Sequence, residues 1–68
     1  MTLEQVQEIF HAQLSQNPKD LFYFVYGGGQ AEVIRHRLDQ KSLQDLADAL
    51  TGLEYEPSAD ATPKFRKV

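Results

Sequence analysis

The segment Leu21–Tyr26 limits the fold of this 68-residue chain more than any other, because nearly every position in it is apolar. A short run that is dense in aromatic and branched residues is typical of a β-strand. Gly27–Gly29 follows at once, and glycines supply the positive φ angles of a tight turn. Ala31–Leu38 is then a second strand, so the two segments are predicted to form a β-hairpin.

The two faces of this hairpin cannot both be covered by two short helices. Alternate residues of the second strand lie on opposite faces. The predicted core face carries Ile34, His36 and Leu38, and the other face carries Val33, Arg35 and Arg37. The first strand is apolar on both faces, and a one-residue slip in the turn would exchange its inward and outward sets. Either set could point inward, and the other would stay partly exposed.

A helix is predicted before the hairpin, from Thr2 to about Gln16. Thr2 and Gln5 have the spacing of a capping box, in which each side chain binds an otherwise unpaired backbone N–H. Asn17 ends the helix, because the residue before a proline is driven out of the helical region. The apolar face of this helix consists of Leu3, Val6, Phe10 and Leu14, with Ile9 beside them.

A second helix is predicted from Ser42, with Asp45 as its capping-box partner. Gly52 either ends this helix or interrupts it, and both readings fit the spacing. The apolar stripe is Leu43, Leu46, Ala47, Leu50 and Leu53.

Beyond the second helix the composition becomes polar and rich in proline, which predicts a flexible segment with little apolar area to bury. The predicted fold is therefore α+β, a small single domain of helix, β-hairpin and helix over residues 1–56. Residues 57–68 form a flexible tail that ends in basic and apolar side chains.

Charge and composition narrow the function. The chain carries ten acidic and seven basic residues, and an acidic body argues against duplex binding, which needs cations for several phosphates. There is no cysteine, so disulfides and thiolate metal sites are excluded. Met1–Gln5 is polar and acidic, unlike a signal peptide, and no apolar run reaches the roughly 20 residues of a membrane span. A cytoplasmic location without membrane contact is predicted.

The sequence predicts neither an enzyme nor a cofactor or metal site. Glu8 and His11 have metal-ligand spacing on a helix, but a useful site needs more ligands at one point. Gly27–Gly29 leads into a strand, whereas a phosphate-binding loop leads into a helix. Arg35 and Arg37 beside aromatic residues could stack on nucleic-acid bases, but the acidic body favours a solvated strand face.

The predicted second helix carries a resemblance to a phage protein family. The family's pattern there is Ser, an aliphatic residue, any residue and Asp-Leu, followed later by an aliphatic residue and Leu-Glu. The chain matches it with Ser42, Leu43, Asp45, Leu46, Leu50, Leu53 and Glu54. With its hairpin, its length and its terminal valine, the chain resembles the head–tail joining (head completion) protein W family of lambda-like phages.

This resemblance implies a structural role in virion assembly. Such proteins bind the portal vertex after DNA packaging and form the surface for later connector and tail attachment. The charged body and the modest core predict a monomer in the host cytoplasm, and the resemblance implies a ring subunit in the virion. In that family apolar residues at the extreme C-terminus are needed, which implies here that the tail orders on its partner. The implied residues are Lys64, Phe65, Arg66, Lys67 and Val68.

The alternative is a small bacterial regulatory or adaptor protein that binds one protein partner through exposed hairpin aromatics. For this function the candidate partner-binding residues are Phe22, Phe24, Arg35 and Arg37. Both readings predict function through protein–protein contact.

Overall fold

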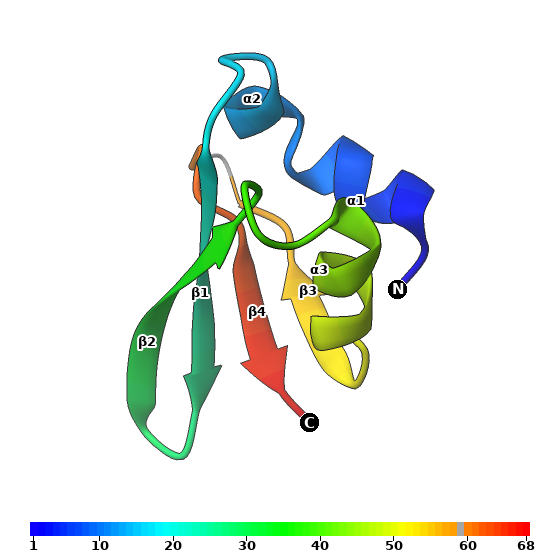
Figure 1. The fold of residues 1–68 in the computed structure, drawn as a ribbon. Coiled ribbons are helices and arrows are strands. Elements are labelled where there is room, and N and C mark those ends of the chain that lie inside the picture. Colours follow the sequence, from blue (N-terminus) through cyan, green and yellow to red (C-terminus); the bar gives the residue numbers. More distant parts are fainter. Residues whose placement is uncertain (59) are drawn as a thin grey trace.

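Within residues 1–58 and 60–68, which the computed structural model describes, three short helices pack on a four-stranded sheet (Figure 1). The sheet order is β2-β1-β4-β3, with β1 and β4 parallel and the two outer pairs antiparallel. The predicted α+β class is confirmed. The elements are α1 (Leu3–Ile9), α2 (His11–Leu14), β1 (Asp20–Gly27), β2 (Gln30–Arg37), α3 (Leu43–Ala49), β3 (Leu53–Glu56) and β4 (Lys64–Lys67).

The hairpin of β1 and β2 forms as predicted, and the structure fixes its register. Gly28 and Gly29 make the turn with φ angles of 59° and 77°, which favour glycine over any residue with a Cβ. The ladder runs from Gly27 opposite Gln30 to Asp20 opposite Arg37. This register turns three side chains of β1 toward the helices, together with the predicted core face of β2: Leu21, Tyr23 and Val25, then Ile34 and His36.

The first predicted helix is interrupted. Thr2 and Gln5 form the expected capping box, but Phe10 separates α1 from α2 with φ −95° and ψ 14°. Phe10 is fully buried, and its ring lies 6.0 Å from that of Tyr23 and 6.3 Å from that of Phe65. Tertiary packing of this ring therefore overrides the local preference for one continuous helix.

The second helix is shorter than its apolar stripe suggested. Ser42 and Asp45 form the predicted capping box, and α3 ends before Leu50. Gly52 follows with φ 89°, so it belongs to the turn that ends the helix and does not interrupt it. Leu53 opens β3 instead of extending the helical stripe.

The prediction of a flexible tail is wrong for Lys64–Lys67. These residues form β4, which pairs with β1 on one side and with β3 on the other (Figure 1). Phe65 has no exposed surface and lies in the core. The order of this strand has a physical cause, since both its backbone edges are hydrogen-bonded and its central side chain is buried. Ala59, in the same predicted tail, lies outside the described residues.

The helices lie together on one side of the sheet, and the hydrophobic core is between the two layers (Figure 1). Its helical members are Val6, Phe10, Leu46, Ala47 and Leu50, and its strand members are Leu21, Tyr23, Val25 and Phe65. The opposite side of the sheet has no helix over it in the described part of the chain. None of the described helices has the length and apolar character needed to cross a bilayer.

Candidate functional site

The uncovered side of the sheet, called here the open face, carries a stripe of apolar side chains. Phe22, Phe24 and Tyr26 alternate with the buried residues of β1, so they project away from the helices. Val33 lies opposite Phe24 on β2. Phe22 is 41% exposed and Val33 61% exposed, while Phe24 and Tyr26 are half-buried. These four residues are called the aromatic stripe below.

The stripe is preorganised by its neighbours. The rings of Phe24 and Tyr26 lie 6.2 Å apart in a tilted arrangement that is favourable for aromatic pairs. Arg35 lies opposite Phe22, and its guanidinium Nε is 3.4 Å from a carboxylate oxygen of Asp20. The apolar surface therefore has a charged border at the end of β2.

A second charged border lies on β4 and β3. Lys64 is opposite Phe24 in the sheet, and its ammonium is 3.0 Å from Asp60. Arg66 bonds Glu54 on β3, which raises the pKa of the arginine above its usual value. Because these cations have acidic partners within the molecule, the border is polar but largely neutralised.

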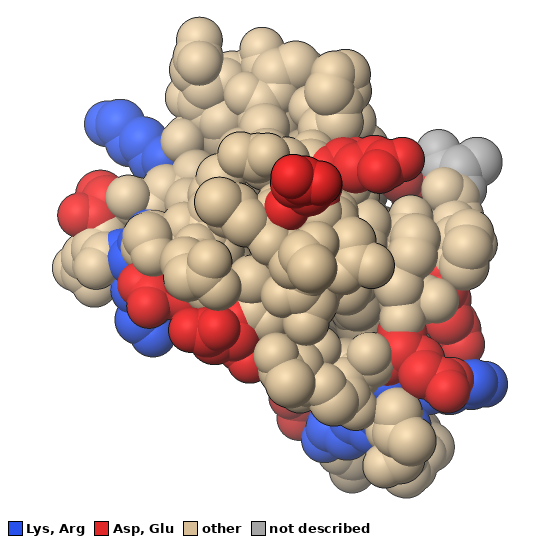
Figure 2. Space-filling model, turned by 90° about the vertical axis from the view of Figure 1, so that its right-hand side faces the viewer, with Lys and Arg blue, Asp and Glu red and all other residues tan. Residues whose placement is uncertain are grey.

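Arg37 closes the border at the end of β2. Its guanidinium donates to both carboxylate oxygens of Asp39, at 3.2 and 2.8 Å, and this contact lowers the pKa of Asp39. Basic side chains are thus frequent around the open face. Figure 2 looks onto the side where the helices lie, and there Asp and Glu are found near the centre and at both edges, where they lie beside Lys and Arg.

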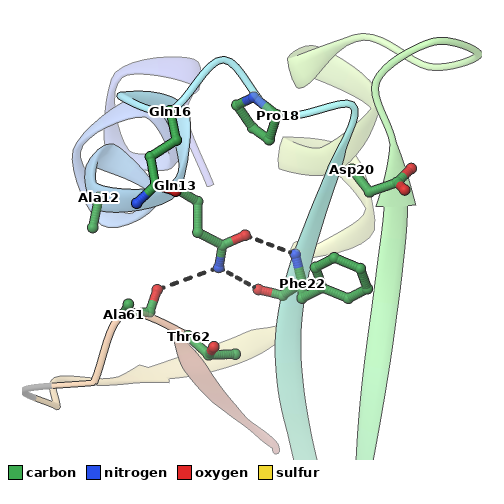
Figure 3. A pocket seen from close by; sticks show the side chains of 8 residues that line it. All are labelled: Ala12, Gln13, Gln16, Pro18, Asp20, Phe22, Ala61 and Thr62. Carbon is green, nitrogen blue, oxygen red and sulfur yellow. Dashed lines mark hydrogen bonds between the residues drawn. The ribbon is translucent and has the colours of Figure 1, made fainter.

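A pocket of about 400 Å³ adjoins the aromatic stripe at Phe22 (Figure 3). It opens between α2 and the segment that leads into β4. Its lining consists of Ala12, Gln13, Gln16, Pro18, Asp20, Phe22, Ala61 and Thr62. Since Phe22 lines the pocket and also ends the stripe, the two form one continuous surface.

Gln13 fixes the position of Phe22 at this junction. Its amide oxygen accepts from the Phe22 backbone N–H at 2.9 Å, and its Nε2 donates to the Phe22 carbonyl at 2.8 Å (Figure 3). Nε2 also donates to the Ala61 carbonyl at 3.3 Å. The next ladder bond along β1 runs from the Phe24 N–H to the Pro63 carbonyl. The glutamine amide thus takes the place of a missing strand residue and extends the ladder by one step.

The predicted partner-binding residues fall into two groups. Phe22, Phe24, Arg35 and Arg37 lie together on the open face, and Lys64 and Arg66 reach the same face from β4. Lys67 and Val68 are exposed at the end of β4, with Val68 91% exposed.

Phe65 does not belong to any exposed site, and its prediction as a docking residue is wrong. It alternates with Lys64 and Arg66, so it points to the helix side and is fully buried. Sequence reasoning missed Tyr26 and Gln13 as parts of the site. The alternation within Leu21–Tyr26 pointed to Tyr26, whereas nothing in the sequence near Gln13 signals its contact with β1.

Comparisons with models of known protein families, with curated proteins and with solved structures found no match for this chain. Among residues 1–58 and 60–68, no group of three or more His, Cys, Asp or Glu side chains is placed to hold a metal ion. The open face combines an apolar stripe, a pocket at one end of it and borders of paired basic and acidic side chains.

Proposed function

We propose that the protein is a binding module that docks one protein partner on the open face of its sheet. The observation that carries this proposal is the aromatic stripe, in which Phe22 and Val33 stay exposed although the other face of the same sheet is covered by helices. A contiguous apolar patch with a polar border is typical of a protein interaction site.

The charges around the stripe favour a partner whose apolar surface is bordered by acidic groups. Arg35, Arg37, Lys64 and Arg66 all lie on or beside the open face. Each already pairs with an acid of this chain at the surface, where such pairs contribute at most about 1 kcal/mol. An acidic partner can therefore exchange with these carboxylates at little cost, and the guanidinium groups can orient the complex.

Phe22 is the expected centre of the binding energy. Its side chain is partly exposed where the stripe meets the pocket, and Gln13 bonds both its backbone N–H and its carbonyl. Rigid aromatic residues in such positions are frequent hot spots, worth about 2 kcal/mol or more when truncated. The pocket beside it has room for a side chain of the partner.

The head–tail joining role is a specific form of this proposal, with the portal vertex as the partner. Because Phe65 is part of the core, the joining role cannot use an ordering tail anchored by that residue, and the open face takes over the docking. The adaptor role would use the same face on a cellular partner. A partner that is a ring assembly favours the joining role, and a monomeric partner favours the adaptor.

Phe22→Ser tests the docking surface, with Leu3→Ser on α1 as the matched control, because Leu3 is 38% exposed on the helix side. Proteins recovered with the tagged wild-type chain should be lost with Phe22→Ser and retained with Leu3→Ser. With the purified partner, NMR shift changes should cluster on the open-face residues of β1 and β2. Shift changes on α1 and α3, or equal recovery by both variants, would contradict the proposal.

A further inference from the structure

The outer edge of β2 carries a row of unpaired backbone groups. Phe22 and Phe24 direct their N–H groups toward Gln13 and Pro63, away from β2. Since hydrogen bonding alternates along an antiparallel ladder, the residues of β1 between and beside these two bond β2. Their partners on β2 are Glu32, Ile34 and His36. The residues between them direct their N–H and C=O groups outward. They are Ala31, Val33 and Arg35, all exposed, and none of these backbone groups has a partner elsewhere in the described residues.

The two edges of the sheet are protected very differently. β3 is only four residues long, and very short edge strands resist further pairing. β2 is eight residues long and contains no proline, and its register with β1 is unbroken from end to end. In the part of the chain that the structure describes, no helix or loop covers its outer side (Figure 1). A long, regular and uncovered edge is a template for another strand.

We infer that β2 pairs with β2 of a second copy of this chain, antiparallel, around a twofold axis at Val33. The three residues with free backbone groups are spaced symmetrically about Val33, so the axis places Val33 opposite Val33 and Ala31 opposite Arg35 of the second copy. Each of these is a hydrogen-bonded pair, in which both residues donate and accept. Every outward N–H and C=O of the three residues is then satisfied.

Other registers are less favourable because of charge and backbone geometry. An axis at Glu32 would place two carboxylates opposite each other, and an axis at Arg35 would place two guanidinium groups opposite each other. Both registers are unfavourable because like charges directly opposite in a sheet are destabilising. An axis at Ile34 places Ala31 against Arg37, whose carbonyl already accepts from the N–H groups of Gln40 and Lys41. The axis at Val33 has no like charges opposite each other.

The twofold pairing also joins the exposed apolar surfaces. Val33 is the outermost member of the aromatic stripe and lies opposite Phe24 within the protomer. In the dimer the order across the open face is Phe24, Val33, then Val33 and Phe24 of the second copy. Two open faces become one surface on a continuous eight-stranded sheet, with both helical layers on the other side. A dimer replaces the monomer expected from the acidic composition. This inference concerns the edge of β2 and does not depend on the proposed function of the open face.

Disulfide trapping tests the pairing and its register, because the chain contains no cysteine. Hydrogen-bonded pairs bring Cα atoms to about 5.5 Å, within the range that a disulfide spans. Val33→Cys should therefore form a covalent dimer on mild oxidation, seen on a non-reducing gel. Ala31→Cys alone should not, but an equimolar mixture of Ala31→Cys and Arg35→Cys should give the mixed dimer. Trapping of Ile34→Cys in preference to Val33→Cys would overturn the proposed axis.

Light scattering after size exclusion gives the independent measurement on the unmodified chain. The wild type should shift toward twice the chain mass as its concentration rises. Val33→Pro should stay a monomer with an unchanged circular dichroism spectrum, because the N–H that it removes points outward and proline is tolerated at strand edges. Val33→Lys provides a second edge variant that keeps the N–H. A wild type that is monomeric at millimolar concentration, with Val33→Cys no more readily oxidised than Ala31→Cys, would refute the inference.

Discussion

Replacing Phe65 by alanine tests whether the C-terminal strand is part of the fold. Phe65 is fully buried, and it lies at the centre of an aromatic cluster. Its ring is 5.6 Å from Tyr23, 5.5 Å from Tyr55 and 6.3 Å from Phe10 between centroids. These neighbours come from β1, β3 and the junction of α1 with α2, so the cavity left by the substitution would touch every layer of the domain.

The expected loss is large relative to the stability of so small a domain. Truncating a buried phenylalanine to alanine costs about 3–5 kcal/mol, from lost transfer free energy and the cavity that remains. A chain of 68 residues has a total free energy of unfolding of about 3–10 kcal/mol. Phe65→Ala should therefore leave the protein largely unfolded or lower its melting temperature by about 12 °C or more. Phe65→Leu, which keeps most of the volume, should cost about 1 kcal/mol.

Urea titration and thermal melting followed by circular dichroism measure both variants. Val68→Ala is the matched control in the same terminal segment, because Val68 is 91% exposed and its truncation should change the free energy of unfolding by less than about 0.5 kcal/mol. If Phe65→Ala melts at the wild-type temperature, β4 does not contribute to the core and the docking tail predicted from the sequence regains its basis.

Three further substitutions probe individual contacts. Gln13→Ala removes the amide that bonds both backbone groups of Phe22, so it should cost about 1 kcal/mol and speed hydrogen exchange at the Phe22 amide. Gly52→Ala puts a Cβ on a residue with φ 89° and should destabilise the domain by about 1 kcal/mol in urea titration. The backbone N–H and the hydroxyl of Ser42 bond the Asp45 carboxylate and lower its pKa. The stability that this contact contributes is therefore complete above the ordinary aspartate pKa of about 3.9, and it is lost as the pH falls through the lowered pKa. Asp45→Asn should flatten this acid-side decline in the urea midpoint, and an unchanged decline would show that the contact is not formed.

The parts of the fold set by local chemistry were predictable from the sequence. Both helix starts could be predicted because a capping box needs only two suitable residues three positions apart. The pairs are Thr2 with Gln5 and Ser42 with Asp45. The hairpin followed from an apolar run that ends in glycines, and only its register needed the structure. The break at Phe10 was not predictable, since it depends on where that ring packs against strands far along the chain.

The missed strands show what a local reading overlooks. β3 and β4 are each only four residues long and mostly charged, and proline and other turn residues lie between them. Alternation was nevertheless present, with acids at Glu54 and Glu56 and bases at Lys64 and Arg66. Opposite charges at matching alternate positions are what an antiparallel pair needs, and the structure places Glu54 opposite Arg66 and Glu56 opposite Lys64. That complementarity is long-range, so neither segment reveals it alone.

Because Phe65 lies in the core and not in a flexible tail, a different surface is available for binding a partner. As a tail, Lys64–Val68 would supply apolar anchors and free cations to a partner, and the hairpin aromatics would be a secondary surface. As β4, the same segment seals the helix side with Phe65, while Lys64 and Arg66 become a border of the open face. The segment therefore supplies no docking tail, but it supplies two basic residues to the border of the open face. Since β4 lies between β1 and β3, its loss would also separate the aromatic stripe from its charged border, and binding and folding should therefore fail together when Lys64–Val68 is deleted.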